Sequence, residues 1–419
     1  MRLAGRGALG LIGTLIVVGG AGLRATECKN ESIAVTDIGR RYSLGQTMLD
    51  NQAIFEIPQP GAKYLRAQVT IENGNCQWFL TVRDRYFRPV QTFSPESHLT
   101  YDSFWTVRVY GDNMVLDLKR CPGRSDLPKV TVAGYIAMDE RANNPYYSRQ
   151  NDAFPAYQDL YRGAQTPGVP VVPEYMKRLG DSVGLLMSSY GTQAWSCSGT
   201  MLRDGMFLTN WHCGGLPPLR EVSYWREDVV RDTIIDLSWD GDTVSREYSG
   251  TKLLAGSPEL DYALLEVAPI ADGGKSYPVS IDLVQPQSSM DIAIIHHVEA
   301  RLKQISRCKI ADPRYSGPES LPRSVEFSHK CDTEHGSSGA PVFAADGALI
   351  GIHRAGFALD ERCQRLNSVN RAVSMCPIIS HIREKYYAVY ERLKNQLVPN
   401  PRDCPGVGVS SELVRRSSE

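Results

Sequence analysis

Three short patterns place a histidine, an aspartate and a serine where such side chains could catalyse acyl transfer. A strand-like run, Phe207–Cys213, contains His212 and ends in the cysteine that follows it. Asp261 opens an otherwise apolar strand, and Ser338 lies in the Gly-rich turn 336–339. A serine hydroxyl is a weak nucleophile until an imidazole takes its proton and a carboxylate orients that imidazole.

Each pattern has an ordinary structural explanation when it is taken alone. A histidine at a strand end is often only polar, and an aspartate at a strand start often caps backbone groups. A Gly/Ser turn can be a linker, but a linker would not run directly into Pro341-Val-Phe343. The glycines let the backbone turn tightly, so that successive N–H groups can point to one side and hold an oxyanion.

Together, the three patterns resemble those of the chymotrypsin-like serine proteases. The His-Cys motif, the strand-initial aspartate and the Gly-x-Ser-Gly-x-Pro motif of that family all occur here, in the family's order. This order differs from that of subtilisins and of α/β-hydrolases. The separations, 49 residues from His212 to Asp261 and 77 from Asp261 to Ser338, suit two small barrels. The likeness covers about residues 180–395.

The resemblance implies a serine endopeptidase with His212, Asp261 and Ser338 as its catalytic triad. Its fold would be two antiparallel β-barrels with the cleft between them, and the backbone N–H groups of Gly336 and Ser338 would bind the oxyanion. The mechanism needs no metal and no organic cofactor. Protein or peptide substrates are the expected partners.

Within the family, the closest likeness is to the bacterial glutamyl endopeptidases. Asp332-Thr333 before the serine turn and His353 after Ile-Gly-Ile resemble that branch. The segment 294–306 resembles one that is common in the branch, although it lacks the usual Pro and Gly. His335 also stands where a small residue or Pro is usual.

The side chains expected at the specificity pocket indicate a preference for glutamate or aspartate on the acyl side of the cut bond. His353 and Thr333 could donate hydrogen bonds to a substrate carboxylate, and pairing with it would raise the pKa of the histidine. The rival is Asp332, six residues before Ser338, where trypsin-like enzymes carry the acid that selects Lys or Arg. Cys331 argues against this rival, because it lies further from the nucleophile than the corresponding trypsin cysteine.

Residues 26–145, ahead of the catalytic patterns, are predicted to form a small β-sandwich-like domain. Apolar and polar residues alternate from Tyr64 to Arg85 and again from Trp105 to Leu118. Asn73-Gly74 and Gly111-Asp112-Asn113 interrupt these stretches, as hairpin turns do. This domain carries no evident chemistry, so it is expected to be a prodomain or a binding module with an unknown partner.

A polar, Pro-rich segment, residues 146–178, has the composition of a linker. From 179 to 395, short strands recur between Gly, Asp and Pro turns, as in barrels. Ile378 to Leu393 carries apolar residues at spacings of three and four, which predicts a helix, and residues 396–419 form a tail. The fold class is therefore all-β, a double antiparallel β-barrel with a C-terminal helix behind an N-terminal sandwich.

Residues 1–25 resemble an export signal. Two arginines precede the apolar run Leu9–Val18, and small residues follow up to Ala25. The apolar run is shorter than the roughly 20 residues that span a bilayer. Secretion or a periplasmic location without stable membrane association is expected. An uncleaved anchor and lipidation of Cys28 are the alternatives.

Charge and cysteine content narrow the classes further. The 46 Lys and Arg residues balance the 47 Asp and Glu residues, so nucleic acid is not an expected partner. Ten cysteines in an exported chain predict disulfides, and the lack of any CxxC pair argues against zinc. The family resemblance implies a Cys197–Cys213 bond. Cys308–Cys331 and Cys363–Cys376 are further candidates, and the four remaining cysteines allow three pairings: Cys28, Cys76, Cys121 and Cys404.

Two other classes of function remain. A protein with this fold can lose activity and serve as a binding module, because fold alone does not decide function. The N-terminal domain could also do the main work, as an adhesion or carbohydrate-binding domain.

Overall fold

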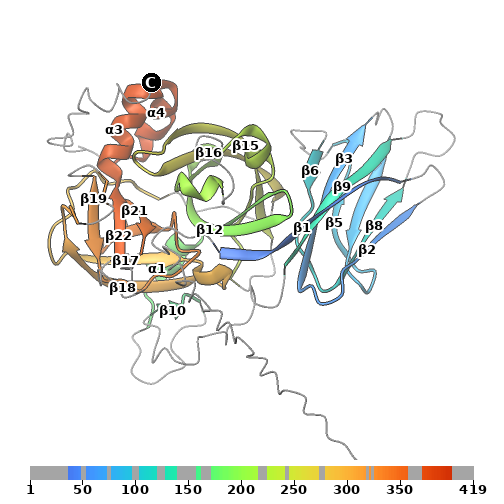
Figure 1. Cartoon of the computed structure of the whole chain (residues 1–419), viewed down its shortest axis with the longest axis horizontal. Helices are drawn as coiled ribbons and strands as arrows, with labels where there is room; N and C mark the ends of the chain where they lie inside the picture. Colours follow the sequence, from blue (N-terminus) through green and yellow to red (C-terminus); the bar gives the residue numbers. More distant parts are fainter. Residues whose placement is uncertain are drawn as a thin grey trace, which may run out of the picture.

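The computed structural model describes thirteen stretches of the 419-residue chain: 36–48, 53–72, 77–96, 103–119, 128–138, 157–161, 171–215, 224–240, 245–272, 279–317, 320–321, 325–356 and 370–398. Figure 1 shows two adjoining bodies, a flat all-β body at one end and a larger body of barrels and helices. Among the described residues, no helix is both long and apolar enough to cross a membrane.

The N-terminal body is a sandwich of two antiparallel sheets. In β3, alternate side chains such as Leu65, Ala67 and Val69 point into the core between the sheets. One sheet contains β1 (Thr36–Thr47), β9 (Lys129–Met138), β3 (Tyr64–Glu72), β6 (Ser103–Trp105) and β7 (Val109–Tyr110). The other contains β2 (Ile54–Pro58), β8 (Asn113–Lys119), β4 (Phe79–Arg83) and β5 (Pro89–Phe93).

The two turn signals in this region do not form the hairpins that the sequence suggested. The strands before and after Asn73-Gly74, β3 and β4, belong to different sheets. The strands around Gly111-Asp112, β7 and β8, are also separated in this way. In a sandwich the chain must pass from one sheet to the other, so a turn-forming sequence between two strands does not require that these strands pair.

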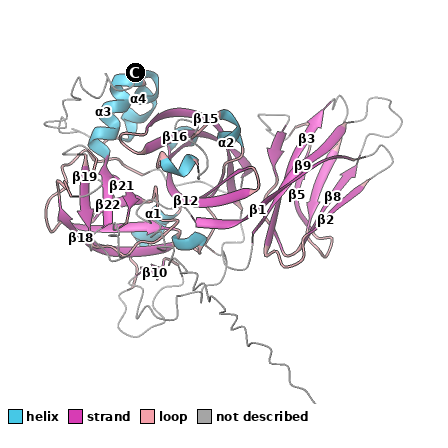
Figure 2. Ribbon diagram, viewed as in Figure 1, coloured by secondary structure: helices cyan, strands magenta, loops and turns pink. Residues whose placement is uncertain are grey.

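Six strands close the first barrel in the order β11, β14, β15, β16, β13, β12, with β12 paired back to β11. Small helices accompany it, and Figure 2 shows how little of the molecule is helical. The bounds are β11 Val183–Tyr190, β12 Gln193–Leu202, β13 Met206–Thr209, β14 Ile234–Asp236, β15 Arg246–Ser257, β16 Tyr262–Asp272, α1 Glu174–Gly180 and α2 Glu227–Arg231.

Six further strands close the second barrel in the order β18, β17, β20, β21, β22, β19, and β19 returns to β18. The expected double antiparallel barrel is therefore confirmed. The bounds are β17 Asp291–His296, β18 Gln304–Asp312, β19 Glu326–His329, β20 Pro341–Ala344, β21 Leu349–Ala355 and β22 Asn370–Ser374. Within the segment expected to be a linker, β10 (Tyr157–Asp159) pairs with β18, and α1 also forms there.

The C-terminal helix is confirmed in place but is not continuous. Helix α3 spans Met375–Lys385 and α4 spans Tyr387–Leu393, with Tyr386 between them at φ −133°. The Tyr386 hydroxyl donates to the carbonyl of Gly256 in the first barrel. The helix is thus interrupted at the residue whose side chain is bonded to the first barrel. The apolar periodicity of the sequence does not reveal this interruption.

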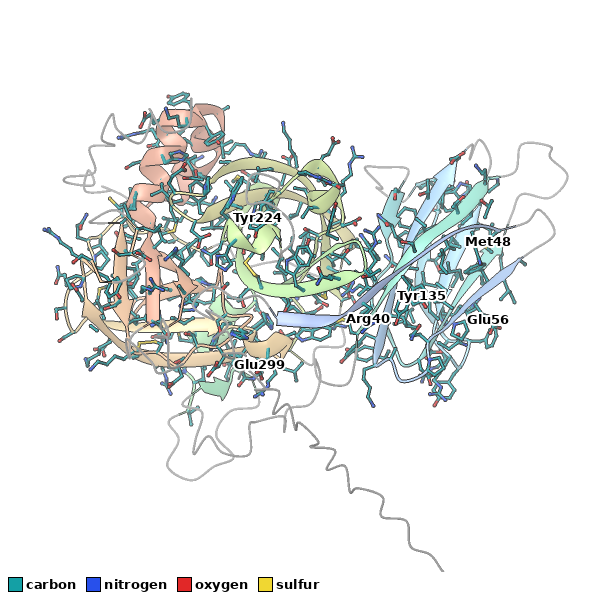
Figure 3. The ribbon with its side chains drawn as sticks, in the orientation of Figure 1. Arg40, Met48, Glu56, Tyr135, Tyr224 and Glu299 are labelled. Carbon is teal, nitrogen blue, oxygen red and sulfur yellow. A yellow bond between two sulfur atoms is a disulfide. The ribbon has the colours of Figure 1, made fainter. Side chains whose placement is uncertain are left out.

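Strand β1 joins the sandwich to the first barrel. Its first residues pair with β12, from Thr36 opposite Ser196, and most of the strand pairs with β9. Gly39 lies where both pairings meet, at φ +143°, and a Cβ there would approach a carbonyl oxygen of β9 within 2.2 Å. Only glycine suits this crossing. Figure 3 shows Arg40 between the two bodies and Met48 at the far end of the sandwich.

Buried charges lie across the same junction. Arg66 of β3 pairs with Asp236 at 3.0 Å and with Glu247, and Arg108 also pairs with Asp236. All four side chains are at most 3% exposed. Two cations thus meet two anions, and we call these four residues the junction cluster. Apolar contacts surround it, including the ring of Tyr64 against that of Trp239.

Several predictions concern residues outside the described part of the chain. These are the export signal 1–25, nearly all of the tail, and the pairing of Cys28, Cys76, Cys121, Cys363 and Cys404. Two disulfides have both of their cysteines in the described part of the chain. Cys197–Cys213 has a Cα–Cα distance of 6.1 Å, and Cys308–Cys331 one of 4.9 Å, so both predicted bonds are present.

Candidate active site

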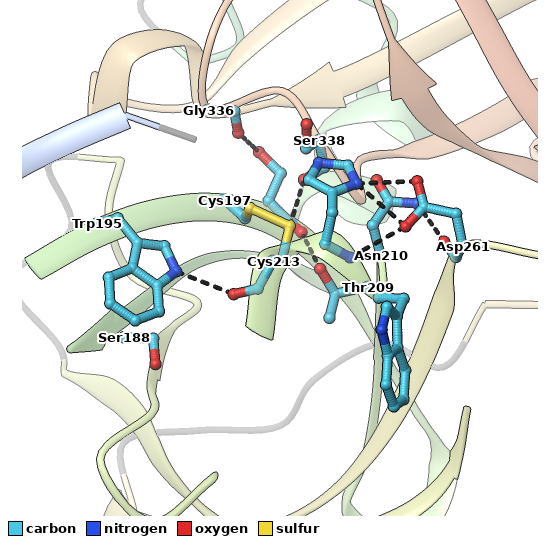
Figure 4. Close-up of a disulfide and its surroundings, with 12 residues drawn as sticks. Ser188, Trp195, Cys197, Thr209, Asn210, Cys213, Asp261, Gly336 and Ser338 are labelled. Atoms are coloured by element: carbon cyan, nitrogen blue, oxygen red, sulfur yellow. Dashed lines mark hydrogen bonds and ion pairs between the residues drawn. A yellow bond between two sulfur atoms is a disulfide. The ribbon is translucent and has the colours of Figure 1, made fainter. Parts of the chain in front are cut away.

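His212 lies just after β13, at the start of a short 3₁₀ turn, His212–Gly214. The Cys197–Cys213 disulfide ties this turn to β12 (Figure 4). The indole of Trp195 donates to the carbonyl of Cys213 at 2.9 Å and fixes the turn from the other side. The imidazole is therefore held by the covalent and hydrogen-bonded frame of the first barrel.

Asp261 directly precedes β16 and accepts hydrogen bonds from His212. Its Oδ2 is 2.8 Å from Nδ1 of the ring, and its Oδ1 is 3.0 Å from the His212 backbone N. Asn210 donates to the Asp261 carbonyl at 2.7 Å, which fixes the aspartate backbone as well. Asp261 has φ +45°, an unfavourable value for a residue with a side chain, and such strain clusters at functional sites.

The pKa of Asp261 lies below its ordinary value. Burial alone would raise it, but the charge and hydrogen bonds of His212 and the charge of Arg354 outweigh that effect. The carboxyl is therefore ionised at neutral pH. A carboxylate at Nδ1 holds the proton there and leaves Nε2 as the base of the imidazole.

Ser338 reaches the first barrel because its turn packs against β12. Its carbonyl accepts from the backbone N of Ser198 at 2.8 Å, and the Ser198 hydroxyl donates to the carbonyl of Gly336 at 2.7 Å (Figure 4). Gly339, at φ +81°, is the position that allows this approach. A Cβ there would lie 2.3 Å from both the Ser198 carbonyl oxygen and the Thr209 hydroxyl.

His212 and Ser338 are brought to one region without a hydrogen bond between them. Within the described stretches, Nε2 of His212 is buried and has no hydrogen-bond partner. In a Ser-His-Asp triad, this is the nitrogen that takes a proton from the serine hydroxyl. Catalytic hydrogen bonds are often long in enzymes without substrate and shorten when it binds.

Two backbone N–H groups of the serine turn are candidates for an oxyanion site. The N–H of Ser337 donates to Glu334, and that of Gly339 donates to His353. As far as the described residues go, the N–H groups of Gly336 and Ser338 donate no such bond. Gly336 has φ +86°, which turns the backbone between them. The pair predicted from the sequence therefore has its donors available.

His353 lies beside the same turn and is bonded to a second histidine. Its backbone N donates to Ala340 at 2.8 Å, and its Nδ1 is 3.2 Å from Nε2 of His329. Burial, followed by the neighbouring histidines and Arg371, holds the pKa of His353 well below its ordinary value. Burial also lowers the pKa of His329, to about 3. Both rings are therefore neutral at pH 7.

The two neutral rings have a preferred arrangement of protons. Nδ1 of His329 is buried and has no partner among the described residues. A bare acceptor there costs less than an orphaned N–H donor, so His329 carries its proton on Nε2 and donates it to His353. His353 then has its own proton on Nε2, where it can be donated to a ligand.

The other two predicted pocket residues differ in exposure. Thr333 is buried, and its hydroxyl has no partner among the described residues. The side chain of Asp332 is exposed, while its backbone N–H donates to the Ser306 hydroxyl oxygen at 3.0 Å. An acid that selects Lys or Arg must lie inside a pocket, so the exposure of Asp332 disfavours that role.

Ser337, the residue before Ser338, is held by a further histidine. In the structure its hydroxyl lies 2.8 Å from Nδ1 of His296, and both residues are fully buried. Burial, then nearby His297 and His329, lowers the pKa of His296 to about 3. A neutral hydrogen bond therefore anchors the residue next to Ser338. The adjacent pair His296-His297 in the sequence was the only signal for it.

Two charged residues near the site were also missed. Arg354 pairs with Asp261 across 3.2 Å from Nε to Oδ2. The same guanidinium donates to Oε1 of Glu326 at 3.0 Å. The position of Arg354 next to the predicted pocket residue His353 was a possible sequence signal for it. No motif surrounds Glu326, so the sequence offered no signal for that residue. We call Asp261, Glu326, Arg354 and His212 the site cluster.

Two groups of side chains have the proximity of metal ligands: Cys197, His212 and Cys213, and Cys308, His329 and Cys331. Every cysteine in them is bonded to another cysteine. Metal binding requires thiolates, so neither group fits a metal as it stands.

Residues 197–352 match the family profile described as "Trypsin-like peptidase domain". The match supports a trypsin-like peptidase domain over this range and, through that family, a peptidase of the serine type. It does not distinguish the glutamyl endopeptidase branch. No curated protein matches the chain.

Among solved structures, similarity was found to the Rv3671c protease of M. tuberculosis. A serine-to-alanine mutant in an inactive form is 14% identical, with a TM-score of 0.37, and covers 51% of this chain and 91% of its own. The active form is 16% identical, with a TM-score of 0.37, and covers 50% and 82%. We draw no functional conclusion from likeness at this level.

Proposed function

We propose that the chain is a serine endopeptidase with His212, Asp261 and Ser338 as its triad. The observation that carries the proposal is the buried Asp261–His212 hydrogen bond beside a serine turn whose two N–H donors are available. Residues 1–25 and the two disulfides suit an exported enzyme.

The reaction follows from these positions. The Ser338 hydroxyl attacks the scissile carbonyl carbon, and Nε2 of His212 takes its proton as the new bond forms. The N–H groups of Gly336 and Ser338 bind the oxyanion, and one such donor is worth about 3 kcal/mol in the transition state. The imidazolium returns its proton to the leaving amine, and water then releases the acyl group by the same steps.

We further propose a preference for glutamate or aspartate on the acyl side of the cut bond. The ring Nε2–H of His353 and the hydroxyl of Thr333 would donate hydrogen bonds to the substrate carboxylate. Because the pKa of His353 is depressed by burial, the empty pocket is neutral and binds the carboxylate through hydrogen bonds. The bound anion would raise that pKa again. The nearby charge of Arg371 also favours an anion.

The catalytic part is tested with a fluorophosphonate probe, which reacts with activated serines. The full chain should be labelled once, and Ser338→Ala should not be labelled. Ser337→Ala is the matched control and should keep most of the labelling. Absence of labelling in the unaltered chain favours a binding module.

The specificity is tested with peptides that differ only in the residue before the cut bond. The kcat/KM for glutamate should exceed that for its isostere glutamine by about 100-fold or more. The neutral amide cannot accept from both pocket donors as a carboxylate does, so polar groups of the pocket would stay unpaired. His353→Ala should remove most of this ratio, and Asp332→Asn should keep it. Cleavage after Lys or Arg in place of Glu contradicts the acidic preference and leaves the triad intact.

A further inference from the structure

Arg354 occupies an unusual place in the second barrel. Its side chain is 9% exposed and lies between two carboxylates, that of Asp261 at 3.2 Å and that of Glu326 at 3.0 Å. Asp261 belongs to the first barrel and Glu326 to β19 of the second. The guanidinium therefore links the two barrels at the proposed active site.

A β-bulge aims the arginine there. In the pairing of β21 with β22, His353 lies opposite Ala372 and Ala355 lies opposite Arg371, so Arg354 is the extra residue. A bulge breaks the alternation of side chains along a strand and redirects one of them, often beside an active site. His353 and Arg354 can therefore both serve the site, although they are neighbours in the chain.

The charges of the site cluster do not cancel when His212 is neutral. Asp261 and Glu326 contribute two negative charges and Arg354 contributes one positive charge. The Glu326 side chain is fully buried and also accepts from the backbone N of Leu321. One negative charge is left over, and the imidazolium that forms during catalysis would neutralise it.

We propose that Arg354 and Glu326 form a positioning pair that sets the basicity of His212. Arg354 holds Asp261 ionised and in place, but its own charge opposes protonation of the nearby imidazole. Glu326 offsets that opposition. The inference rests on the proposed function, because it concerns the proton that His212 takes from Ser338.

The pair predicts opposite shifts in the pH at which labelling of Ser338 by a fluorophosphonate is half-maximal. Arg354→Met leaves two carboxylates without their cation, so this pH should rise. Glu326→Gln leaves the cation uncompensated, so it should fall. Each shift should be about half a pH unit to one unit, as for single charges a few ångströms away. The neighbouring groups that could also titrate or carry charge, His353, His329 and Arg371, are unchanged in both variants.

Two further variants complete the test. Arg354→Lys keeps the positive charge and should keep the half-maximal pH near that of the unaltered chain. The double variant Arg354→Met/Glu326→Gln should also lie near it, because the net charge is restored. Each profile is normalised to its own maximum, which removes differences between variants in the amount of labelling-competent protein. Glu326→Gln alone still tests the sign if Arg354→Met does not fold.

The outcomes are distinguishable. Opposite shifts with recovery in the double variant establish the pair as an electrostatic device. Unshifted profiles, or shifts of one sign in both single variants, reduce Arg354 and Glu326 to structural residues and leave the protease proposal standing. An unaltered chain that is not labelled at any pH overturns both proposals.

Discussion

The junction cluster and the site cluster are built from the same parts in different proportions. Each holds a buried arginine between two carboxylates from different strands, Arg66 at the junction and Arg354 at the site. The junction has a second arginine, Arg108, and its charges cancel. In the site cluster the second basic group is His212, which carries a positive charge only when it is protonated.

The difference separates a cluster with a structural role from one suited to the proposed reaction. A buried cluster that is already neutral gains nothing from a proton and is costly to disturb, since an unpaired buried charge is poorly tolerated. A cluster that carries a leftover negative charge favours the protonated imidazole that would form in the proposed reaction. Counting the formal charges around a buried arginine thus distinguishes the two roles here.

The largest expected difference between an effect on activity and an effect on stability is at Ser338. Ser338→Ala should lower kcat/KM for peptides by more than about 10⁴-fold, because triad members act as a unit. The urea midpoint should stay unchanged, since the hydroxyl belongs to neither charge cluster. Ser337→Ala should show the reverse pattern: most activity kept, and a lower midpoint from the lost bond to His296. Near-full activity in Ser338→Ala would sink the mechanism.

A second test uses pH, because the described histidines all lie on the barrel side of the molecule and none at the junction. His296, His297 and His329 have pKa values of about 3 in the fold, chiefly from burial. The unfolded chain takes up these protons near pH 6.5, so stability is highest above pH 6.5 and is lost as pH falls toward 3. Each histidine costs about 1.4 kcal/mol per pH unit in that window.

Urea unfolding at pH 7.5 and at pH 5.5 measures this loss. Between these two pH values, the three histidines should together lower the free energy of unfolding by about 4 kcal/mol, about 3 kcal/mol of it below pH 6.5. The sandwich, followed by the fluorescence of its buried tryptophans, should not lose stability on its own in this range. Equal stability at the two pH values would mean that these rings are protonated in the fold.

A third test disturbs the neutral cluster. Arg66→Met leaves Asp236 and Glu247 with one arginine between them and should destabilise the protein by about 3–5 kcal/mol. The kcat/KM per folded molecule should not change, because the site cluster is intact. Thermal or urea unfolding measures the first quantity, and active-site titration corrects the second. A loss of specific activity would show that the junction also shapes the site.

The smallest effect is expected from a pair on the sandwich surface. Arg83 and Asp117 form an ion pair at 2.8 Å with side chains 22% and 19% exposed. Arg83→Met should cost about 1 kcal/mol or less, as for other solvent-screened pairs. It is the matched control for Arg66→Met, with the same substitution on the same domain. A cost equal to that of Arg66→Met would remove burial as the explanation.

Local patterns were sufficient to predict the barrels and the proposed triad. Strand periodicity depends on neighbouring residues, and the motifs around His212, Asp261 and Ser338 each lie within one short segment. The Cys197–Cys213 bond followed from the resemblance that those motifs carry. The features that could be predicted are therefore those that depend on residues close together in the sequence.

The two charge clusters could not be predicted in this way. Glu326 and Arg354 are brought together by strand pairing through β22, and Arg66 meets Glu247 from another domain. Isolated charged residues have no pattern, and a one-residue bulge leaves no mark in the sequence. The turn signals at Asn73-Gly74 and Gly111 were misleading for a related reason, since a turn signal in the sequence does not specify which strands pair.

Strand β1 also bears on the order in which the molecule assembles. Chains emerge from the ribosome N-terminus first, and β9, at Lys129–Met138, completes the pairing of β1 within the sandwich. The barrel strand that β1 also pairs with, β12, is synthesised only later, at Gln193–Leu202. The first residues of β1 then wait as an open edge with free backbone groups. That edge is available to β12 once it is made, so the sheet of the first barrel can extend from a strand that the sandwich already holds.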